Sequence, residues 1–306
     1  MWLELQIFGF RALWSPYFLM YIVLLSLLYF LITGPLRHRF GQVDRPTSKQ
    51  QVYFYTGMIL LYLVKGSPVD LLSHMMLTAH MIQMGIYLLI IPILLLKGIP
   101  AWIWRKVVEL PVVRPVFNIL SKPLVALLIF NLCFSLYHMP FVFDFSKSSR
   151  LAHASISIVM RIAALLMWWN VFTPLKERKT LQPLLRMLYM VANAALITPA
   201  CVLIIFSSTP LFAAYSSEGA WLQALSLCVP GNVLDGLSLD YSSAELFSPM
   251  STVADQQLGA IIMKVISEFV YGSIIGTTFF KWSKSKKDSD RIDPLPEQLT
   301  HSHQNS

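Results

Sequence analysis

Charged side chains are scarce in this chain. Asp, Glu, Lys and Arg make up 13% of the 306 residues, whereas hydrophobic residues make up 56%. Soluble domains carry about 25% charged residues, so this composition excludes an ordinary soluble domain and indicates a polytopic membrane protein. The net charge of +8 does not point to a nucleic-acid partner, because the basic residues lie between long apolar runs, where they set membrane topology.

Cysteines are few as well: the chain has Cys133, Cys201 and Cys228. Two of them lie within apolar runs and no C-x-x-C pair occurs, so no disulfide framework is expected. Cys228 falls in a predicted outer loop, where it would suit a thiol contact with a partner. The sequence also lacks a P-loop, an H-E-x-x-H pair and a serine-hydrolase elbow. A conventional enzyme is therefore not expected.

Long apolar runs are what the chain has instead. With about 20 residues needed for each crossing, they predict an all-α membrane protein, a bundle of about seven transmembrane helices. The first run lacks the features of a cleaved signal peptide and is expected to remain as a helix. The polar segment 281–306 is expected to be a disordered cytoplasmic tail. The predicted spans lie near residues 14–33, 51–66, 68–97, 123–140, 151–173, 184–207 and 254–280.

Basic residues alternate between the predicted connections. The first, third and fifth connections and the C-terminal tail are rich in Lys and Arg, whereas the long loop 208–253 has none. Because basic connections stay in the cytoplasm, this pattern predicts a plasma-membrane protein with its N-terminus outside and its C-terminus in the cytoplasm. The outer loop carries four acidic residues, Glu218, Asp235, Asp240 and Glu245.

Four histidines are predicted to lie at the outer ends of different spans. His74 and His80 are near the start of the third span, His138 ends the fourth and His153 opens the fifth. The segment Ser67-Pro68-Val69-Asp70 before the third span is a helix-capping pattern. An ionisable side chain at membrane depth is a functional candidate, and imidazole together with thioether suits Cu(I).

The third span carries the densest group of candidate ligands. Met76, His80 and Met84 are spaced i, i+4 and i+8, so a continuous helix over 68–97 places them in one stripe. His74 and Met81 lie on a second stripe of the same helix. Methionine is also a common apolar filler, and His74 would equally suit an interfacial polar position. For His80, a role in metal binding or proton transfer is expected.

The other outer helix ends add further candidates. His138 and Met139 supply an imidazole and a thioether before Pro140, although a histidine there can also cap the last carbonyls of its helix. His153 would serve either as a ligand or as an ordinary interfacial residue. Asp255 shares one face of the seventh helix with Met263, and it also fits a helix-capping role. The full set of predicted copper ligands is His80, Met84, Met76, Met81, His74, His138, Met139, His153, Asp255 and Met263.

Four sequence blocks, in this order and spacing, resemble a known membrane family. They are H-M-I-Q-M with I-I-P-I-L-L-L-K-G-I-P between residues 80 and 100, Y-H-M-P at 137–140, M-W-W at 167–169 and D-Q-Q-L-G-A-I-I-M at 255–263. Together they are similar to the CtaG family, assembly factors of the caa(3)-type cytochrome c oxidase in Gram-positive bacteria. The opening F-R-A-L-W-S-P-Y at 10–17 also resembles the Bacillus members.

The chain departs from this family pattern at three positions. Many members have histidine where this chain has Met84 and Ser157, and tryptophan where it has Lys264. Methionine in place of histidine keeps a ligand compatible with Cu(I), whereas serine does not, which leaves ligation by His153 open.

The resemblance implies a role in producing active oxidase. The expected function is to supply or hold Cu(I) at the outer membrane face for metallation of oxidase subunit I or II, with an extracytoplasmic copper donor as a further partner. Three alternatives stay open from the sequence: a copper permease, a haem-binding membrane protein with two histidine ligands, and a metal-free scaffold for oxidase subunits. The sequence leaves open a monomer or a homodimer, and CuA or CuB as the destination.

Overall fold

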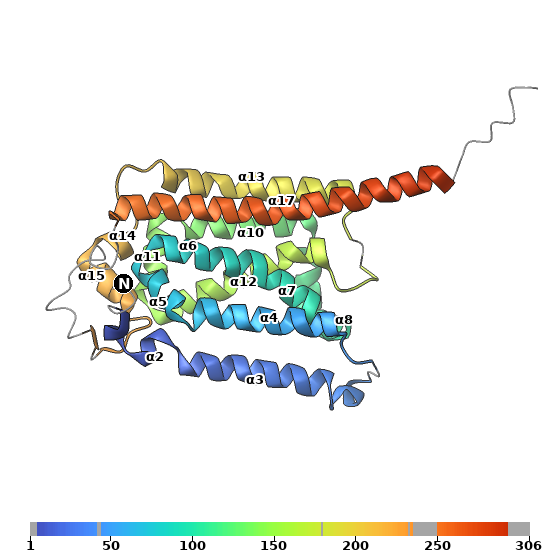
Figure 1. Cartoon of the computed structure of the whole chain (residues 1–306), viewed down its shortest axis with the longest axis horizontal. Helices are drawn as coiled ribbons and strands as arrows, with labels where there is room; N and C mark the ends of the chain where they lie inside the picture. The colour runs from blue at the N-terminus through green and yellow to red at the C-terminus, as the bar shows by residue number, and fades with distance from the viewer. Residues whose placement is uncertain (1–4, 42–43, 179, 232, 235–249, 293–306) are drawn as a thin grey trace, which may run out of the picture.

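The computed structural model describes residues 5–41, 44–178, 180–231, 233–234 and 250–292. All regular structure in these ranges is helical (Figure 1), in agreement with the all-α fold predicted from the sequence. The long helices are α3 (Pro16–Thr33), α4 (Ser48–Lys65), α10 (Pro123–Tyr137), α12 (Arg150–Phe172), α13 (Pro183–Ile205) and α17 (Thr252–Ile292). The shorter elements are η1 (Gln6–Phe8), α2 (Phe10–Leu13), η2 (Arg37–Phe40), α5 (Pro68–Met75), α6 (Leu77–Gly85), η3 (Ile86–Ile90), α7 (Ile91–Gly98), α8 (Ala101–Val108), α9 (Val113–Leu120), α11 (Pro140–Ser148), α14 (Ala213–Ser216) and α15 (Glu218–Leu225).

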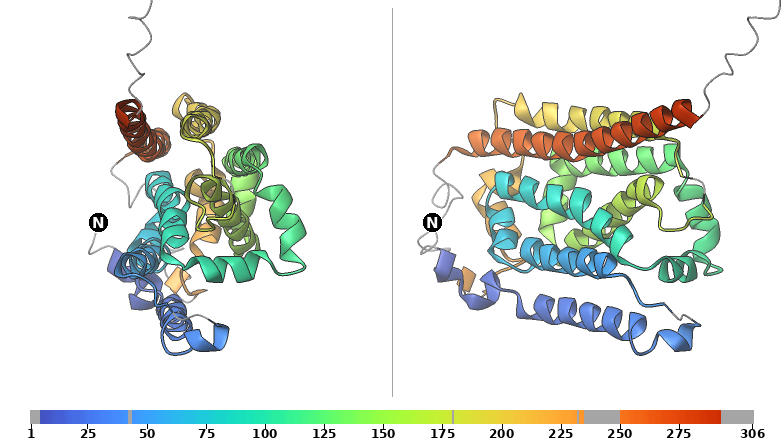
Figure 2. Two further views of the ribbon diagram at one scale, coloured as in Figure 1. Left: turned by 90° about the vertical axis from the view of Figure 1, so that its right-hand side faces the viewer. Right: turned by 45° about the vertical axis from the view of Figure 1, so that its right-hand side comes forward.

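The long helices lie side by side as a bundle. Helices α3 and α17 are on opposite sides of it in all three views (Figures 1 and 2). The short helices α2, α5, α11, α14 and α15 gather at one end, on the left in Figure 1, which we call the α5–α15 end. This end has a small core of its own, to which Leu5, Phe8, Leu71 and Leu225 contribute. Packed short helices therefore close the bundle at the end where the histidines were predicted.

Within the described ranges, five helical segments are long and apolar enough to cross a membrane, and a sixth follows if the pair α9 and α10, bent by 85°, counts as one span. This number is smaller than the seven spans predicted. The predicted span 51–66 falls in α4, whose first turn, Ser48 to Gln51, is polar. That turn leaves α4 with fewer apolar residues than the ~20 that a full crossing needs.

The segment from Leu77 to Gly98 lies at the centre of the bundle. In its most apolar stretch, 72% is buried inside the protein, whereas the corresponding share for α3 is 17%. Helix α3 is therefore the span most exposed to lipid. Helices α6 and α7 are surrounded by protein, which gives their polar side chains an environment shielded from the hydrocarbon.

The third span is not the continuous helix that the sequence predicted over 68–97. Helix α5 ends at Met75, and Met76 is extended, with φ −143° and ψ 143°, before α6 begins at Leu77. A π-helical turn, η3, then precedes Pro92. Proline has no N–H, so the carbonyl of Leu88 loses its helical donor, and Trp168 Nε1 of α12 donates to it at 3.0 Å instead.

Other elements cap both sides of the break at Met76. The carboxylate of Asp255, at the start of α17, accepts hydrogen bonds from the backbone N–H of Leu77 at 2.6 Å and of Thr78 at 3.2 Å. On the other side, the Ser73 carbonyl of α5 accepts hydrogen bonds from Tyr215 Oη at 2.7 Å and Lys147 Nζ at 3.3 Å. The break is thus a supported feature of the fold, because the backbone groups that it frees find partners.

Helix α17 approaches α6 very closely at Gly259. A Cβ atom built on this glycine would lie 3.0 Å from the backbone of Leu77 and Thr78. The small residue lets the start of α17 reach the start of α6, which is what allows Asp255 to cap it. This contact fixes the position of α6, and with it His80, one turn further along.

Lys264 and Glu268, spaced i and i+4, form an ion pair on α17. Lys264 Nζ also donates to Thr198 Oγ1 of α13 at 2.7 Å and to the carbonyl of Ala194 at 3.2 Å, which joins the two helices. Helix α17 continues past residue 281 to Ile292. The remainder of the predicted tail, 293–306, and much of the acidic outer loop, 235–249, lie outside the described residues.

Candidate metal-binding centre

His80 is enclosed by aromatic rings near the α5–α15 end. Its side chain is 1% exposed, and its ring centre lies 5.1 Å from that of Phe143, 5.8 Å from Tyr137 and 6.3 Å from His138. Both ring nitrogens are buried without a hydrogen-bond partner among the described residues. A buried polar atom left unpaired costs about 1–3 kcal/mol of stability. The two unpaired nitrogens of His80 therefore indicate a position where a ligand can bind.

His138 presents a third such nitrogen to the same region. It is the C-cap of α10 and is 1% exposed. Its Nδ1 lies 2.8 Å from the Phe134 carbonyl, so Nδ1 carries the proton and Nε2 keeps a free lone pair. Nε2 is buried and has no partner within the described part of the chain. His138 thus combines both roles foreseen from the sequence, because one nitrogen caps the helix and the other is free to bind.

The separation of the two imidazoles suits a single ion. Their ring centres lie 6.3 Å apart. Two metal–nitrogen bonds of about 2.0 Å, each added to the distance from a nitrogen to its ring centre, span a gap of this size. With neutral imidazoles as donors, the pair suits Cu(I) chemically and offers little to hard ions such as Mg²⁺.

The predicted thioethers divide between core and surface. Met81, Met84 and Met263 are buried in the main core, and Met84 follows His80 by four residues within α6. Met76 stands at the break, outside the helical stripe that the sequence predicted for it. Met139 is 48% exposed. Met81, Met84 and Met263 are therefore the predicted thioether ligands that lie inside the bundle with His80.

Asp255 has its carboxylate engaged in the backbone of α6, as described above. The aspartate predicted as a ligand is thus occupied by two N–H donors, and it caps a neighbouring helix as well as lying in the first turn of its own. Its part in the site is to hold the first turn of α6, three residues before His80.

His74 and His153 form a second pair, apart from His80 and His138. Their ring centres lie 5.3 Å apart, and His153 Nδ1 is buried without a partner among the residues described. Both line a cavity of about 440 Å³ bordered by α3, α4 and α12. The four histidines predicted to lie at one level therefore occur as two pairs, His80 with His138 and His74 with His153.

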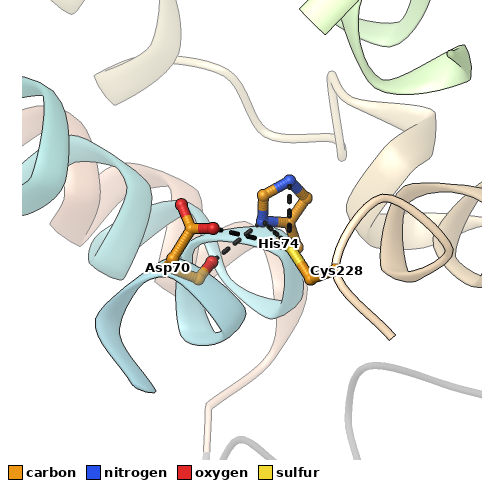
Figure 3. Close-up of side chains that lie close together, drawn as sticks. All are labelled: Asp70, His74 and Cys228. Atoms are coloured by element: carbon orange, nitrogen blue, oxygen red, sulfur yellow. Dashed lines mark hydrogen bonds between the residues drawn. The ribbon is translucent and has the colours of Figure 1, made fainter. Parts of the chain in front are cut away.

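Two residues beside His74 were not predicted from the sequence to bind metal. Asp70, His74 and Cys228 bring a carboxylate, an imidazole and a thiol within 4.8 Å of one another (Figure 3). Asp70 was predicted as part of a capping pattern, but its carboxylate contacts Lys65, Gln83 and Cys228. Cys228 comes from a segment distant in sequence, and no sequence motif predicts its contact with His74.

Lys147 of α11 lies beside the first pair. Its side chain is 2% exposed, and Nζ lies 5.6 Å from the centre of the Phe143 ring, which also packs against His80. Burial, with a further contribution from the charge of Lys65, lowers the pKa of Lys147 to about 7. The folded protein therefore carries a lysine that loses its proton near neutral pH, next to a candidate cation site.

Replacing Lys147 with methionine is expected to remove a pH dependence of stability. Because the folded pKa is about 7 and the unfolded pKa is ordinary, about 10.4, the unfolded chain binds the extra proton between these values. The free energy of unfolding of the native protein should then rise with pH above about 7, by up to ~1.4 kcal/mol per unit. The effect is measured as the difference between the apparent Tm values at pH 6.5 and pH 8.5. Lys147→Met should lose this difference. Lys122→Met, a control at an exposed lysine, should keep it. An equal rise in the Lys147→Met variant would show that other groups cause it.

The fold and the site together define a class of protein: an all-helical membrane bundle with paired histidines buried at one end. Within that class, the chain belongs to the family of cytochrome c oxidase caa3 assembly factors (Caa3_CtaG), whose family model matches residues 27–285. The family resemblance noted in the sequence is thereby confirmed, and the chain is a multi-pass protein of the plasma membrane. No curated protein and no solved structure matches it.

Proposed function

We propose that this assembly factor holds Cu(I) between His80 and His138 and supplies it to the maturing caa3 oxidase. The observation that carries the proposal is the set of three buried imidazole nitrogens without partners, two on His80 and one on His138. Unpaired buried polar groups are rare in native proteins, and an ion bound by one nitrogen of each ring satisfies two of these three atoms. Copper is then the cargo of the protein, and no turnover chemistry is needed.

The surroundings favour a soft ion that can be released. Phe143 and Tyr137 pack against the His80 ring and exclude water, which disfavours strongly hydrated ions. Two neutral imidazoles, with Met84 on the same helix face as His80, offer donors that suit Cu(I) and exchange readily. Lys147 becomes charged below about pH 7, and its charge there repels a bound cation.

The distribution of basic residues supports placing this site at the outer face. The connections rich in Lys and Arg follow α3, α7 and α12 and thus lie at the end of the bundle away from His80. By the positive-inside rule that far end faces the cytoplasm. Copper would then arrive at, and leave from, the extracytoplasmic side, where an oxidase subunit or a copper donor meets the α5–α15 end.

The haem-binding alternative is less favoured by the packing. A haem ligated by His80 and His138 would need its macrocycle between two rings that already contact Phe143, Tyr137 and Phe134. A Soret band in the purified protein would support haem over copper. A permease would move copper into proteoliposomes, whereas a protein that holds copper for assembly should bind it without net uptake.

Copper analysis of the purified protein under reducing conditions tests the proposal. The native protein should retain Cu(I), and His80→Ala and His138→Ala should each weaken binding at this site by about 100-fold or more, since even an outer-shell partner is worth 10–100-fold. His38→Ala is the matched control, because His38 is an exposed histidine on η2. If both site variants bind copper as tightly as the control, the proposal is wrong.

A further inference from the structure

We infer a second Cu(I) site, in which the thiolate of Cys228 and the imidazole of His74 bind the ion and His153 completes the coordination. It lies outside the His80–His138 pair and uses a cysteine from a different part of the chain. It would receive copper from the cavity between α3 and α12. The inference does not depend on copper at His80, so the two sites can be tested separately.

The ligand atoms lie close together. Cys228 Sγ lies 3.8 Å from His74 Nε2 and 3.5 Å from His74 Nδ1. An ion with bonds of about 2.3 Å to sulfur and about 2.0 Å to nitrogen, at a trigonal angle, requires a sulfur–nitrogen distance of about 3.7 Å. The observed sulfur–nitrogen distance is close to this value, and the sulfur must shift from beside Nδ1 toward the Nε2 lone pair to share one ion with it.

Outer contacts orient both ligands. His74 Nδ1 donates to the Asp70 carbonyl at 2.9 Å, which fixes the tautomer and leaves the Nε2 lone pair free. A backbone carbonyl behind a ligating imidazole is a recurrent feature of metal sites. One oxygen of the Asp70 carboxylate is held by Gln83 Nε2 at 2.8 Å and Lys65 Nζ at 3.4 Å, and the other lies 3.5 Å from Cys228 Sγ.

His153 lies beside His74 and offers a third donor once its ring turns toward the ion. Its ring centre is 5.3 Å from that of His74, and its Nδ1 is buried without a partner in the described part of the chain. This nitrogen is an observation independent of the Asp70–His74–Cys228 cluster, because it belongs to α12.

The charges of the cluster favour a monovalent ion. The negative charge of Asp70 is balanced by Lys65 in an ion pair. With a neutral thiol and a neutral imidazole beside this ion pair, the four side chains carry no net charge before the metal binds. When Cu(I) forms the sulfur–copper bond, the S–H bond breaks and one proton leaves to solvent, with no change in oxidation state. One positive charge replaces another, whereas Zn(II) would leave an extra charge in a buried site.

Cu(I) titration of the full-length protein in detergent, under anaerobic conditions and against a competing Cu(I) chelator, tests the inference. Cys228→Ser should bind one copper equivalent fewer than the native protein, and Cys201→Ser, at a buried cysteine elsewhere, should bind the native amount. His80→Ala should keep the Cys228-dependent equivalent, which separates this site from the proposed one. Equal copper binding by Cys228→Ser and the native protein would overturn the inference.

Alkylation of the unmodified protein provides a measurement that does not rely on a variant folding. Cu(I) should protect Cys228 from a thiol reagent, as read residue by residue by mass spectrometry, while reactivity at Cys133 stays unchanged. Zn(II) at the same concentration should protect Cys228 at least about tenfold less, because it adds a net charge. Equal protection by Zn(II), or none by Cu(I), would contradict a Cu(I) site at this position.

Discussion

Cells that carry His80→Ala should contain no active caa3 oxidase, although the variant protein should still reach the membrane. The side chain lies in the middle of α6, where alanine is the best helix former, so the helix itself is not weakened. What the change removes is an imidazole with two unpaired nitrogens, which under the proposed function is the principal copper ligand. The measurements are oxidase activity in isolated membranes and the amount of the variant protein in the same membranes.

Two further variants sharpen this result. Met84→His should support oxidase assembly, because histidine adds a Cu(I) donor one turn from His80. His38→Ala should behave like the native protein, since that histidine is exposed on η2. Normal oxidase activity in His80→Ala cells would contradict the copper role and leave a scaffold role for the protein. Loss of the variant from the membrane would call for His80→Gln, which keeps a polar side chain of similar size and should still fail to bind Cu(I).

Much of the architecture could be predicted from hydropathy alone. Apolar runs and helix-starting prolines give the helices, and α10 ends at Tyr137 before Pro140, close to where the sequence predicts. The break at Met76 could not be foreseen, because nothing in residues 68–97 disfavours a helix there. It depends on Asp255 and Lys147, which come from other parts of the chain and cap the freed backbone groups.

The candidate site was predicted in part for a similar reason. Histidines and methionines are conspicuous in an apolar sequence, so His80 and His138 could be singled out by residue type and depth. Pairing is a tertiary property: the sequence places four histidines near one level, but it does not say that they form two pairs. Cys228 and Asp70 were not singled out as candidates because a lone cysteine in a loop and an aspartate in a capping pattern each have an ordinary explanation on their own.

Asp255→Ala is expected to have the largest effect on stability. It removes the acceptor of two backbone N–H groups at the start of α6, Leu77 at 2.6 Å and Thr78 at 3.2 Å. Loss of a helix cap costs about 1–2 kcal/mol, and leaving buried donors unpaired adds about 1–3 kcal/mol, so a loss of roughly 2–5 kcal/mol is expected. Asp255→Asn should lose less, because its side-chain oxygen can still accept one of the two bonds. The measurement is the apparent Tm in detergent, followed together with copper content.

A matched variant at Asp144 separates capping from metal binding. Its carboxylate accepts hydrogen bonds from the backbone N–H of Ala213 at 3.1 Å and Ala214 at 3.0 Å, so it caps α14 in the way that Asp255 caps α6. Asp144→Ala should lower the apparent Tm but leave copper at His80 in place, because α14 does not carry that ligand. Asp255→Ala should lower both, since the first turn of α6 leads directly to His80. If Asp255→Asn lost copper while its apparent Tm stayed native, Asp255 would be a ligand and not a cap. The close contact at Gly259 would then be the feature that fixes the position of α6.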